Sequence, residues 1–145
     1  MRLFKRPVIG YTTGVFDLFH VGHLNLLMAA KSLCDRLVVG VSTDELVAYK
    51  HKSSVIPFDE RIQIVRACRY VDTAVAQVSL DKIEAYKRIK FNSLFVGDDW
   101  YGDPNWNEME DNLAQHGVKI HYFPYTTTTS STLINQKLTE LRNAP

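Results

Sequence analysis

The sequence predicts an α/β fold, a doubly wound parallel sheet with helices on both faces, in one domain that spans residues 1–145. Three observations predict it. Strand-like and helix-like patterns alternate along the whole chain. The continuous apolar run Leu37–Val41 is typical of a strand buried on both faces. The length of 145 residues suits one shared core and is short for two.

The first half of the chain supplies two strands and two helices. A β-like run over Val8–Thr13 ends at Gly14, and the helical spacing of apolar residues predicts a helix over Val21–Leu33. The buried strand Leu37–Val41 follows. Pro57 then occupies the favoured first position of a helix over Phe58–Arg69.

The second half repeats the alternation. Gly97 ends a short buried strand, and Gly117 is a typical helix-ending residue. Strands are expected at Val71–Val78, Ser93–Val96 and Val118–Phe123, and helices at Asp81–Lys90, Asn105–His116 and Ser130–Arg142.

Composition excludes several classes of protein. The formal net charge of +1 gives no global field for nucleic acid or an anionic membrane, so we expect no nucleic-acid partner. No run approaches the ~18 apolar residues of a membrane span, and the cations of residues 1–6 precede no signal-peptide core, so a cytoplasmic location is expected. The isolated Cys34 and Cys68 predict neither a zinc site nor a disulfide.

Four polar segments follow predicted strands. In a doubly wound sheet, ligands bind beyond the carboxyl ends of the strands, so these segments should gather at one edge. They are Thr12–His23, Ser42–Lys52, Gly97–Asp103 and Pro124–Thr132.

The first of these segments, T-T-G-V-F-D-L-F-H-V-G-H, carries two histidines at the start of a helix. His20 and His23 are three apart and so face the same way. Gly14 permits a tight turn, Gly22 lets a phosphate approach the backbone, and the helix N-terminus favours anions. Two alternatives are ordinary core histidines or a metal site shared with Asp17, although a transition metal usually needs a third strong ligand.

This segment closely resembles the G-x-F-D-x-x-H-x-G-H motif of the cytidylyltransferase family, within the HIGH-motif nucleotidyltransferase superfamily. The resemblance extends over roughly Val8 to Leu138. V-S-T-D-E-L at residues 41–46, the lysines 50 and 52, E-R at 60–61, R-Y-V-D at 69–72 and V-G-D-D-W at 96–100 are similar to the glycerol-3-phosphate cytidylyltransferase branch.

The resemblance implies a Rossmann-like fold, CTP as substrate, a divalent metal (usually Mg²⁺) and a homodimer. It implies transfer of CMP to a phosphorylated alcohol, with glycerol 3-phosphate foremost and pyrophosphate released. The implied catalytic residues are His20, His23, Lys50, Lys52 and Arg69, and Asp17 would help to position the metal. The implied nucleotide-binding residues are Thr12, Thr13, Gly14, Phe16, Gly22, Asp98, Trp100, Thr126, Ser130, Ser131 and Thr132.

Several of these residues keep a second interpretation. Lys50 and Lys52 would otherwise belong to a solvated loop, and Trp100 would simply pack. Arg61 and Arg69, eight residues apart on one predicted helix, would share a face, with Arg69 reaching the acceptor phosphate and Arg61 as easily structural. Of two adjacent carboxylates at Asp98 and Asp99, only one would face the ligand.

The segment Y-T-T-T-T-S-S-T departs from the R-T-x-G-I-S-T-T pattern of the family. Tyr125 stands in place of the arginine and Thr128 in place of the glycine. Either Lys50, Lys52 or Arg69 compensates for the missing cation, or the acceptor differs from glycerol 3-phosphate.

A phosphate acceptor is mostly dianionic at neutral pH, because its second pKa is about 6, so in-line attack on the α-phosphorus needs no general base. Ethanolamine phosphate, choline phosphate or another polyol phosphate are alternative acceptors. An adenylyltransferase that uses ATP, and a nucleotide-binding module without catalysis, are alternative functions.

Overall fold

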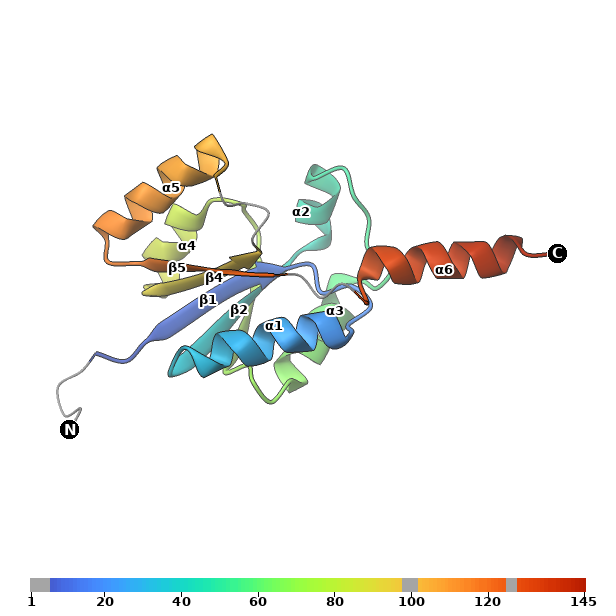
Figure 1. The fold of residues 1–145 in the computed structure, drawn as a ribbon, viewed down its shortest axis with the longest axis horizontal. Helices are drawn as coiled ribbons and strands as arrows, with labels where there is room; N and C mark the ends of the chain where they lie inside the picture. The colour runs from blue at the N-terminus through green and yellow to red at the C-terminus, as the bar shows by residue number, and fades with distance from the viewer. Residues whose placement is uncertain (1–5, 98–101, 125–127) are drawn as a thin grey trace.

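The five strands of the sheet all run parallel, in the order β3-β2-β1-β4-β5 (Figure 1). The structure is a computed structural model that describes residues 6–97, 102–124 and 128–145. The strands are β1 (Ile9–Gly14), β2 (Arg36–Ser42), β3 (Thr73–Gln77), β4 (Ser93–Gly97) and β5 (Lys119–Phe123). The predicted doubly wound parallel sheet is therefore confirmed.

Strand order reverses on either side of β1. At the centre of β1, Tyr11 pairs with Val38 of β2 on one side and with Leu94 of β4 on the other. The chain moves outward from β1 through β2 to β3, and then returns to the other side of β1 for β4 and β5. Such a reversal opens a crevice beyond the carboxyl ends of the two central strands, where ligands of this fold class bind.

Two pairs of helices cover the two faces of the sheet. On one face lie α1 (Val21–Ser32) and α3 (Phe58–Ala67), and on the other lie α4 (Lys82–Ile89) and α5 (Pro104–Gln115) (Figure 1). Each face has its own apolar cluster. Leu27 and Val65 belong to the first, and Tyr11 and Leu113 belong to the second.

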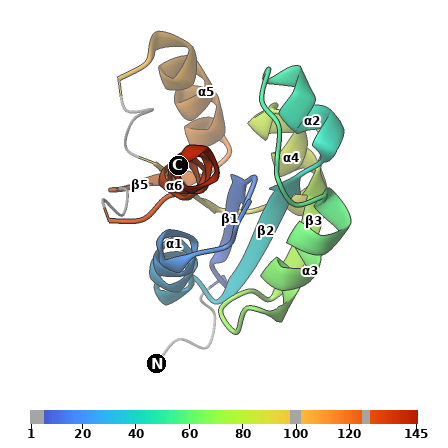
Figure 2. The same ribbon diagram turned by 90° about the vertical axis from the view of Figure 1, so that its right-hand side faces the viewer.

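Two further helices stand at the carboxyl edge of the sheet. The short helix α2 (Asp44–Tyr49) was not predicted from the sequence; the Thr43 hydroxyl caps it by accepting the Leu46 N–H at 3.2 Å. Helix α6 (Ser131–Asn143) begins at this edge and projects away from the body (Figures 1 and 2). None of the residues of α6 is fully buried.

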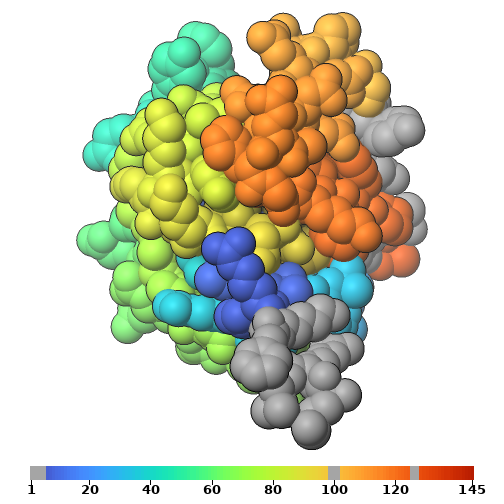
Figure 3. Space-filling model, turned by 90° about the vertical axis from the view of Figure 1, so that its left-hand side faces the viewer, coloured from blue at the N-terminus to red at the C-terminus, as the bar shows by residue number. Residues whose placement is uncertain are grey.

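The opposite, amino edge of the sheet carries residues 6–8, the described part of the chain that precedes β1 (Figure 3). The Val8 N–H donates to the Asp35 carboxylate at 2.7 Å, and the Asn92 amide donates to the Pro7 carbonyl at 3.1 Å.

Within the described ranges, no helix is long and apolar enough to cross a membrane.

Candidate active site

A cavity of about 560 Å³ opens where the crevice between β1 and β4 meets the start of α1. Its walls come from three parts of the chain that are distant in sequence. They are His20, Gly22, His23, Asn25, Leu26 and Ala29 along α1, Gly97, Phe123 and Pro124 beyond β4 and β5, and Thr129, Ser130 and Ser131 at the start of α6. The cavity thus has a donor-rich end at the histidines and serines and an apolar wall along α1 and β5.

The two histidines form one stacked pair at the N-terminus of α1. Their ring centroids lie 3.9 Å apart. His20 Nδ1 accepts the Gly22 N–H at 3.0 Å, and His23 Nδ1 accepts the His20 N–H at 3.2 Å. Because both Nδ1 atoms accept, each ring carries its proton on Nε2, which leaves two N–H donors for a ligand. The prediction that the pair faces one way is confirmed.

Burial favours the neutral form of both imidazoles. It lowers the pKa of His20, and it lowers the pKa of His23 to about 4, with a smaller lowering from the neighbouring His20 and an opposing contribution from Asp17. A bound polyphosphate would reverse this balance, because a nearby negative charge favours the imidazolium. The site is therefore suited to receive an anion together with a proton.

The histidine pair should make stability depend on pH. Because the pKa of His23 is about 4 when folded and 6.5 when unfolded, the unfolded chain binds protons first as the pH falls. Stability is therefore fully present above about pH 6.5 and is lost progressively toward pH 4. Urea unfolding between pH 7.5 and 5 measures this loss, which should be smaller in His23→Gln; equal pH slopes in the two proteins would contradict the assignment.

The two glycines of this segment leave space for the neighbouring aromatic rings, and its first phenylalanine packs near one of the histidines. A Cβ on Gly22 would lie 2.8 Å from the His20 ring, and one on Gly14 would lie 2.9 Å from the Phe16 ring. Gly14 does not itself adopt a positive φ; Phe16 and Leu18 do, at 55° and 52°. Phe16 is buried and packs its ring 5.3 Å from His23, so it supports the histidine rather than facing the cavity.

A second group of polar side chains lies at the same edge, above β1 and β2. Lys82, the first residue of α4, is buried and donates to the Thr13 hydroxyl at 2.8 Å. Burial, with a smaller contribution from Lys50, lowers the pKa of Lys82 to about 8. Burial, Lys52 and Arg61 also lower the pKa of Lys50. The ion pairs among the described residues do not include Lys82. Because a buried charge is costly unless it is paired, a bound anion would stabilise this ammonium.

The sequence reasoning missed Lys82, although a signal was present. The segment between β3 and α4 also follows a strand. Like the four polar segments, it should therefore lie at the carboxyl edge of the sheet, where ligands bind. Asp81 caps α4 by accepting the Ile83 N–H at 2.9 Å, and this cap fixes the start of the helix at Lys82. Lys50 and Lys52 are confirmed as neighbours at this edge, at the end of α2 and in the loop after it.

Arg61 is structural, the interpretation that the sequence left open. Its guanidinium is fully buried and donates to the carbonyls of Val15, Ser42 and Ile56 at 2.7 to 2.8 Å. It also pairs with Asp44 at 2.7 Å. One side chain thereby joins the turn after β1, the end of β2, helix α2 and the loop before α3.

Arg69 does not share a face with Arg61, because α3 ends at Ala67. Arg69 lies in the turn that leads into β3, at the amino edge of the sheet, with its guanidinium 5.7 Å from the Tyr70 ring. The expectation that it reaches the acceptor phosphate is therefore wrong within one copy of the chain. Arg69 also cannot replace the family arginine there, which leaves two of the stated alternatives: compensation by Lys50 or Lys52, or an acceptor other than glycerol 3-phosphate.

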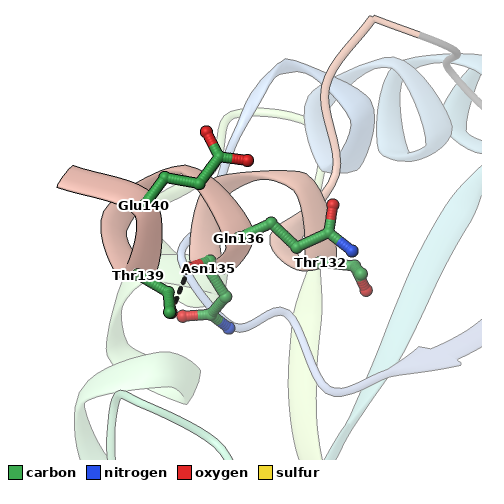
Figure 4. Close-up of a pocket in the computed structure, with 5 residues that line it drawn as sticks. All are labelled: Thr132, Asn135, Gln136, Thr139 and Glu140. Carbon is green, nitrogen blue, oxygen red and sulfur yellow. Dashed lines mark hydrogen bonds between the residues drawn. The ribbon is translucent and has the colours of Figure 1, made fainter. Parts of the chain in front are cut away.

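The predicted hydroxyls divide into two groups. Ser130 caps α6 by accepting the Leu133 N–H at 3.1 Å, and Ser131 lines the cavity beside it. Thr12 is buried and donates to the Phe95 carbonyl at 3.0 Å, so it joins β1 to β4 instead of lining the cavity. Thr132 points into a separate hollow of about 490 Å³ that residues of α6 alone line (Figure 4). Asp98, Trp100 and Thr126 lie outside the described residues.

A dedicated metal site is not evident. Among the described residues, no group of three His, Cys, Asp or Glu side chains could hold an ion. Asp17, the predicted metal residue, is buried, and its two carboxylate oxygens accept backbone N–H groups of Val55 and Ile56 at 2.8 and 3.0 Å. The described part of the chain therefore offers no set of side chains that would hold Mg²⁺ by itself.

Comparison with known proteins finds similarity over most of the chain. A family model described as cytidylyltransferase-like matches residues 11–140. A glycerol-3-phosphate cytidylyltransferase of Bacillus spizizenii is 34% identical over 131 residues, which are 90% of this chain and 96% of that protein. An FAD synthase of Thermococcus kodakarensis is 35% identical over 116 residues, which are 77% and 76% of the two chains.

Among solved structures, a lipopolysaccharide core biosynthesis protein from Thermoplasma volcanium superimposes with a TM-score of 0.71. The match covers 86% of this chain and all (100%) of the other, at 23% identity. At that identity the likeness concerns the fold alone, which it confirms as Rossmann-like.

Proposed function

The chain belongs to the cytidylyltransferase-like family, and we propose that it transfers CMP from CTP to a phosphorylated alcohol, with glycerol 3-phosphate the first candidate and pyrophosphate the second product. The observation that carries the proposal is the stacked histidine pair, which lines a cavity of about 560 Å³ and whose Nε2–H groups have no hydrogen-bond partner among the described residues. A cavity of this volume falls in the range of small-molecule sites.

The triphosphate would lie at the donor-rich end of the cavity. His20 and His23 offer two N–H groups, and the starts of α1 and α6 add the partial positive charge of two helix N-termini. The ribose and base would lie along the apolar wall formed by Leu26, Ala29 and Phe123. This arrangement puts phosphate and base at opposite ends of one cavity.

The acceptor phosphate would bind on the other side of the turn after β1. Lys82 and Lys50 supply the positive charge there, and Lys82 is already partly desolvated. A dianionic phosphate would supply the negatively charged partner that the buried ammonium lacks among the described residues, beside its hydrogen bond to Thr13. Two mutually repelling anions would thus approach one another with cations on one side and N–H donors on the other.

The reaction consists of one displacement. An oxygen of the acceptor phosphate forms a bond to the α-phosphorus, and the bond from that phosphorus to the bridging oxygen breaks, so that its electron pair leaves with pyrophosphate. Because the nucleophile is already an anion, no side chain has to remove a proton. Catalysis would then consist of alignment and of stabilisation of charge on the α-phosphoryl group, to which His23 would contribute its N–H donor.

Mg²⁺ stays a prediction. Since the described residues form no metal cluster, an ion would be bound mainly through the phosphate oxygens of the nucleotide, as is usual for Mg²⁺. We assign it no step of the reaction.

Adenylyl transfer from ATP is the second candidate, and the similarity to FAD synthase favours it. The same cavity, histidines and lysines would serve either nucleotide. Release of pyrophosphate from CTP and from ATP, each offered glycerol 3-phosphate, ethanolamine phosphate, choline phosphate or FMN, separates the candidates. Turnover with CTP and glycerol 3-phosphate is expected; turnover with ATP and FMN alone would replace the proposal by its rival, and no turnover with any pair would refute both.

Replacing Lys82 with methionine should lower kcat/KM for the acceptor by about a hundredfold, because a charged hydrogen bond to a desolvated phosphate is lost. The wild-type pH profile of kcat/KM should fall above about pH 8, as Lys82 loses its proton, and this limb should be absent from the variant. Lys87→Met, on the exposed side of the same helix, is the control. An alkaline limb that survives in Lys82→Met would exclude Lys82 from the acceptor site.

A homodimer and a cytoplasmic location stay predictions. What supports the dimer is the outer face of α1, where Val21, Leu24 and Met28 lie at helical spacing and are 47%, 37% and 45% exposed. Burial of this stripe against a second copy would remove apolar surface from water.

A further inference from the structure

The most constrained residue near the site is Asp17, between the histidines and the end of β1. The residue is 6% exposed, and its carboxylate oxygens accept the Val55 N–H at 2.8 Å and the Ile56 N–H at 3.0 Å. These donors belong to the loop of residues 50–57, which begins with the lysines and ends at α3. A contact across 38 residues of sequence thus joins the lysine-bearing loop to the histidine turn.

The turn that holds Asp17 is strained. Phe16 and Leu18, on either side of it, have φ values of 55° and 52°, a region that non-glycine residues occupy at a cost. Such conformations persist where the surroundings fix them, and here the flanking contacts do so. Phe16 is buried in the core, and the Asp17 backbone carbonyl accepts the Ser131 hydroxyl at the start of α6.

Three separate parts of the site therefore meet at one residue. The backbone of Asp17 belongs to the turn that leads to His20, its carboxylate holds the loop that carries Lys50 and Lys52, and its carbonyl holds the first turn of α6. Arg61 reinforces the loop contact from the other side, because its guanidinium donates to the Ile56 carbonyl at 2.8 Å. The loop is thereby fixed through both its N–H and its C=O groups.

We infer that Asp17 is a positioning residue that fastens the lysine-bearing loop to the histidine turn, and that it is not a metal ligand. Two backbone N–H dipoles already turn their positive ends toward the carboxylate, where a divalent cation would have to approach. Among the described residues, no group of three carboxylate, imidazole or thiolate side chains could hold an ion there. This inference deepens the proposed function and rests on it, because the loop matters for catalysis only if its lysines meet a phosphate.

Asp17→Asn tests this role, because the amide keeps the shape but has only one accepting oxygen. Its NH₂ group would face one of the two backbone N–H groups, donor against donor. Hydrogen exchange of peptides that cover residues 50–57 should accelerate at least tenfold, while exchange in α1 changes little. KM for the acceptor should rise about tenfold or more, and the Mg²⁺ concentration for half-maximal velocity should stay within twofold of wild type.

Two further variants keep the test decisive. Asp35→Asn, which alters a carboxylate that also accepts a backbone N–H but lies at the amino edge, should leave all three readouts unchanged. Val55→Pro removes the donor in place of the acceptor and should reproduce the loosened loop if Asp17→Asn does not fold.

Hydrogen exchange separates failure of the inference from failure of the proposed function, since it needs no turnover. Unchanged exchange over residues 50–57 in both Asp17→Asn and Val55→Pro would overturn the anchoring role, whatever the substrate. A tenfold higher Mg²⁺ requirement in Asp17→Asn, with the loop still protected, would instead identify Asp17 as a metal residue.

Discussion

Replacing His23 with alanine should lower the rate of pyrophosphate release at least a hundredfold and leave the chain folded. Removal of one preorganised donor to a developing oxyanion costs about 2.7 to 4 kcal/mol of transition-state stabilisation. His23 is the more buried partner of the pair, and its ring packs against Phe16 and Phe19, so its donor is held in a fixed direction. Single-turnover measurements with saturating CTP would isolate the chemical step.

Loss of fold must be separated from loss of the donor. His23 Nδ1 accepts the His20 N–H, so alanine also removes a helix cap worth about 1 kcal/mol. His23→Asn retains an acceptor for that N–H but not the imidazole donor, and it should lose activity equally while recovering stability. His116→Ala, at the far end of α5, controls for loss of a histidine elsewhere. Turnover of His23→Ala within a few-fold of wild type would exclude His23 from charge stabilisation.

Replacing Arg61 with methionine should lower the free energy of unfolding by about 3 to 5 kcal/mol, because each desolvated carbonyl that loses its donor costs about 1 to 3 kcal/mol. The change leaves three carbonyls without their donor, and it leaves Asp44 without its partner. Such a loss is a large share of the stability of a domain of this size. Urea unfolding followed by circular dichroism measures it, since single domains of this length usually unfold in one step.

Arg66→Met is the matched control, because Arg66 lies on the same helix, is exposed, and has one contact at 3.4 Å, to the Ala74 carbonyl. Its effect should stay below about 1 kcal/mol. Arg61→Lys should lie between the two, since an ammonium keeps the charge but cannot reach all four acceptors. A loss below 1 kcal/mol in Arg61→Met would mean that the four contacts contribute little to stability.

Much of the fold could be predicted because its signals are local. The apolar run at Leu37–Val41, the helical spacing within Val21–Leu33 and the glycines at 97 and 117 each report on a few neighbouring residues, and the corresponding elements are present. The errors also have local causes. Helix α2 is six residues long and polar at its start, so it lacked a full period, and nothing in the apolar spacing marked the end of α3 at Ala67.

The candidate site, like the fold, could be predicted from the sequence where its signals are local. The sequence alone determined the histidine pair, because both residues lie on one helical turn and their shared direction follows from a spacing of three. It also determined that polar segments after the strands would meet at one edge, since parallel strands end together.

Only the tertiary structure decided which side chains at that edge are committed to other contacts. Asp17 and Thr12 resembled ligand-binding residues, and each is occupied by backbone groups 38 or more residues away. Lys82 was not singled out from the sequence, and it is buried with a hydrogen bond to Thr13, 69 residues distant. The physical reason is that burial and hydrogen-bond partners depend on which loops the packed sheet brings together, and residue spacing along one segment carries no information about that.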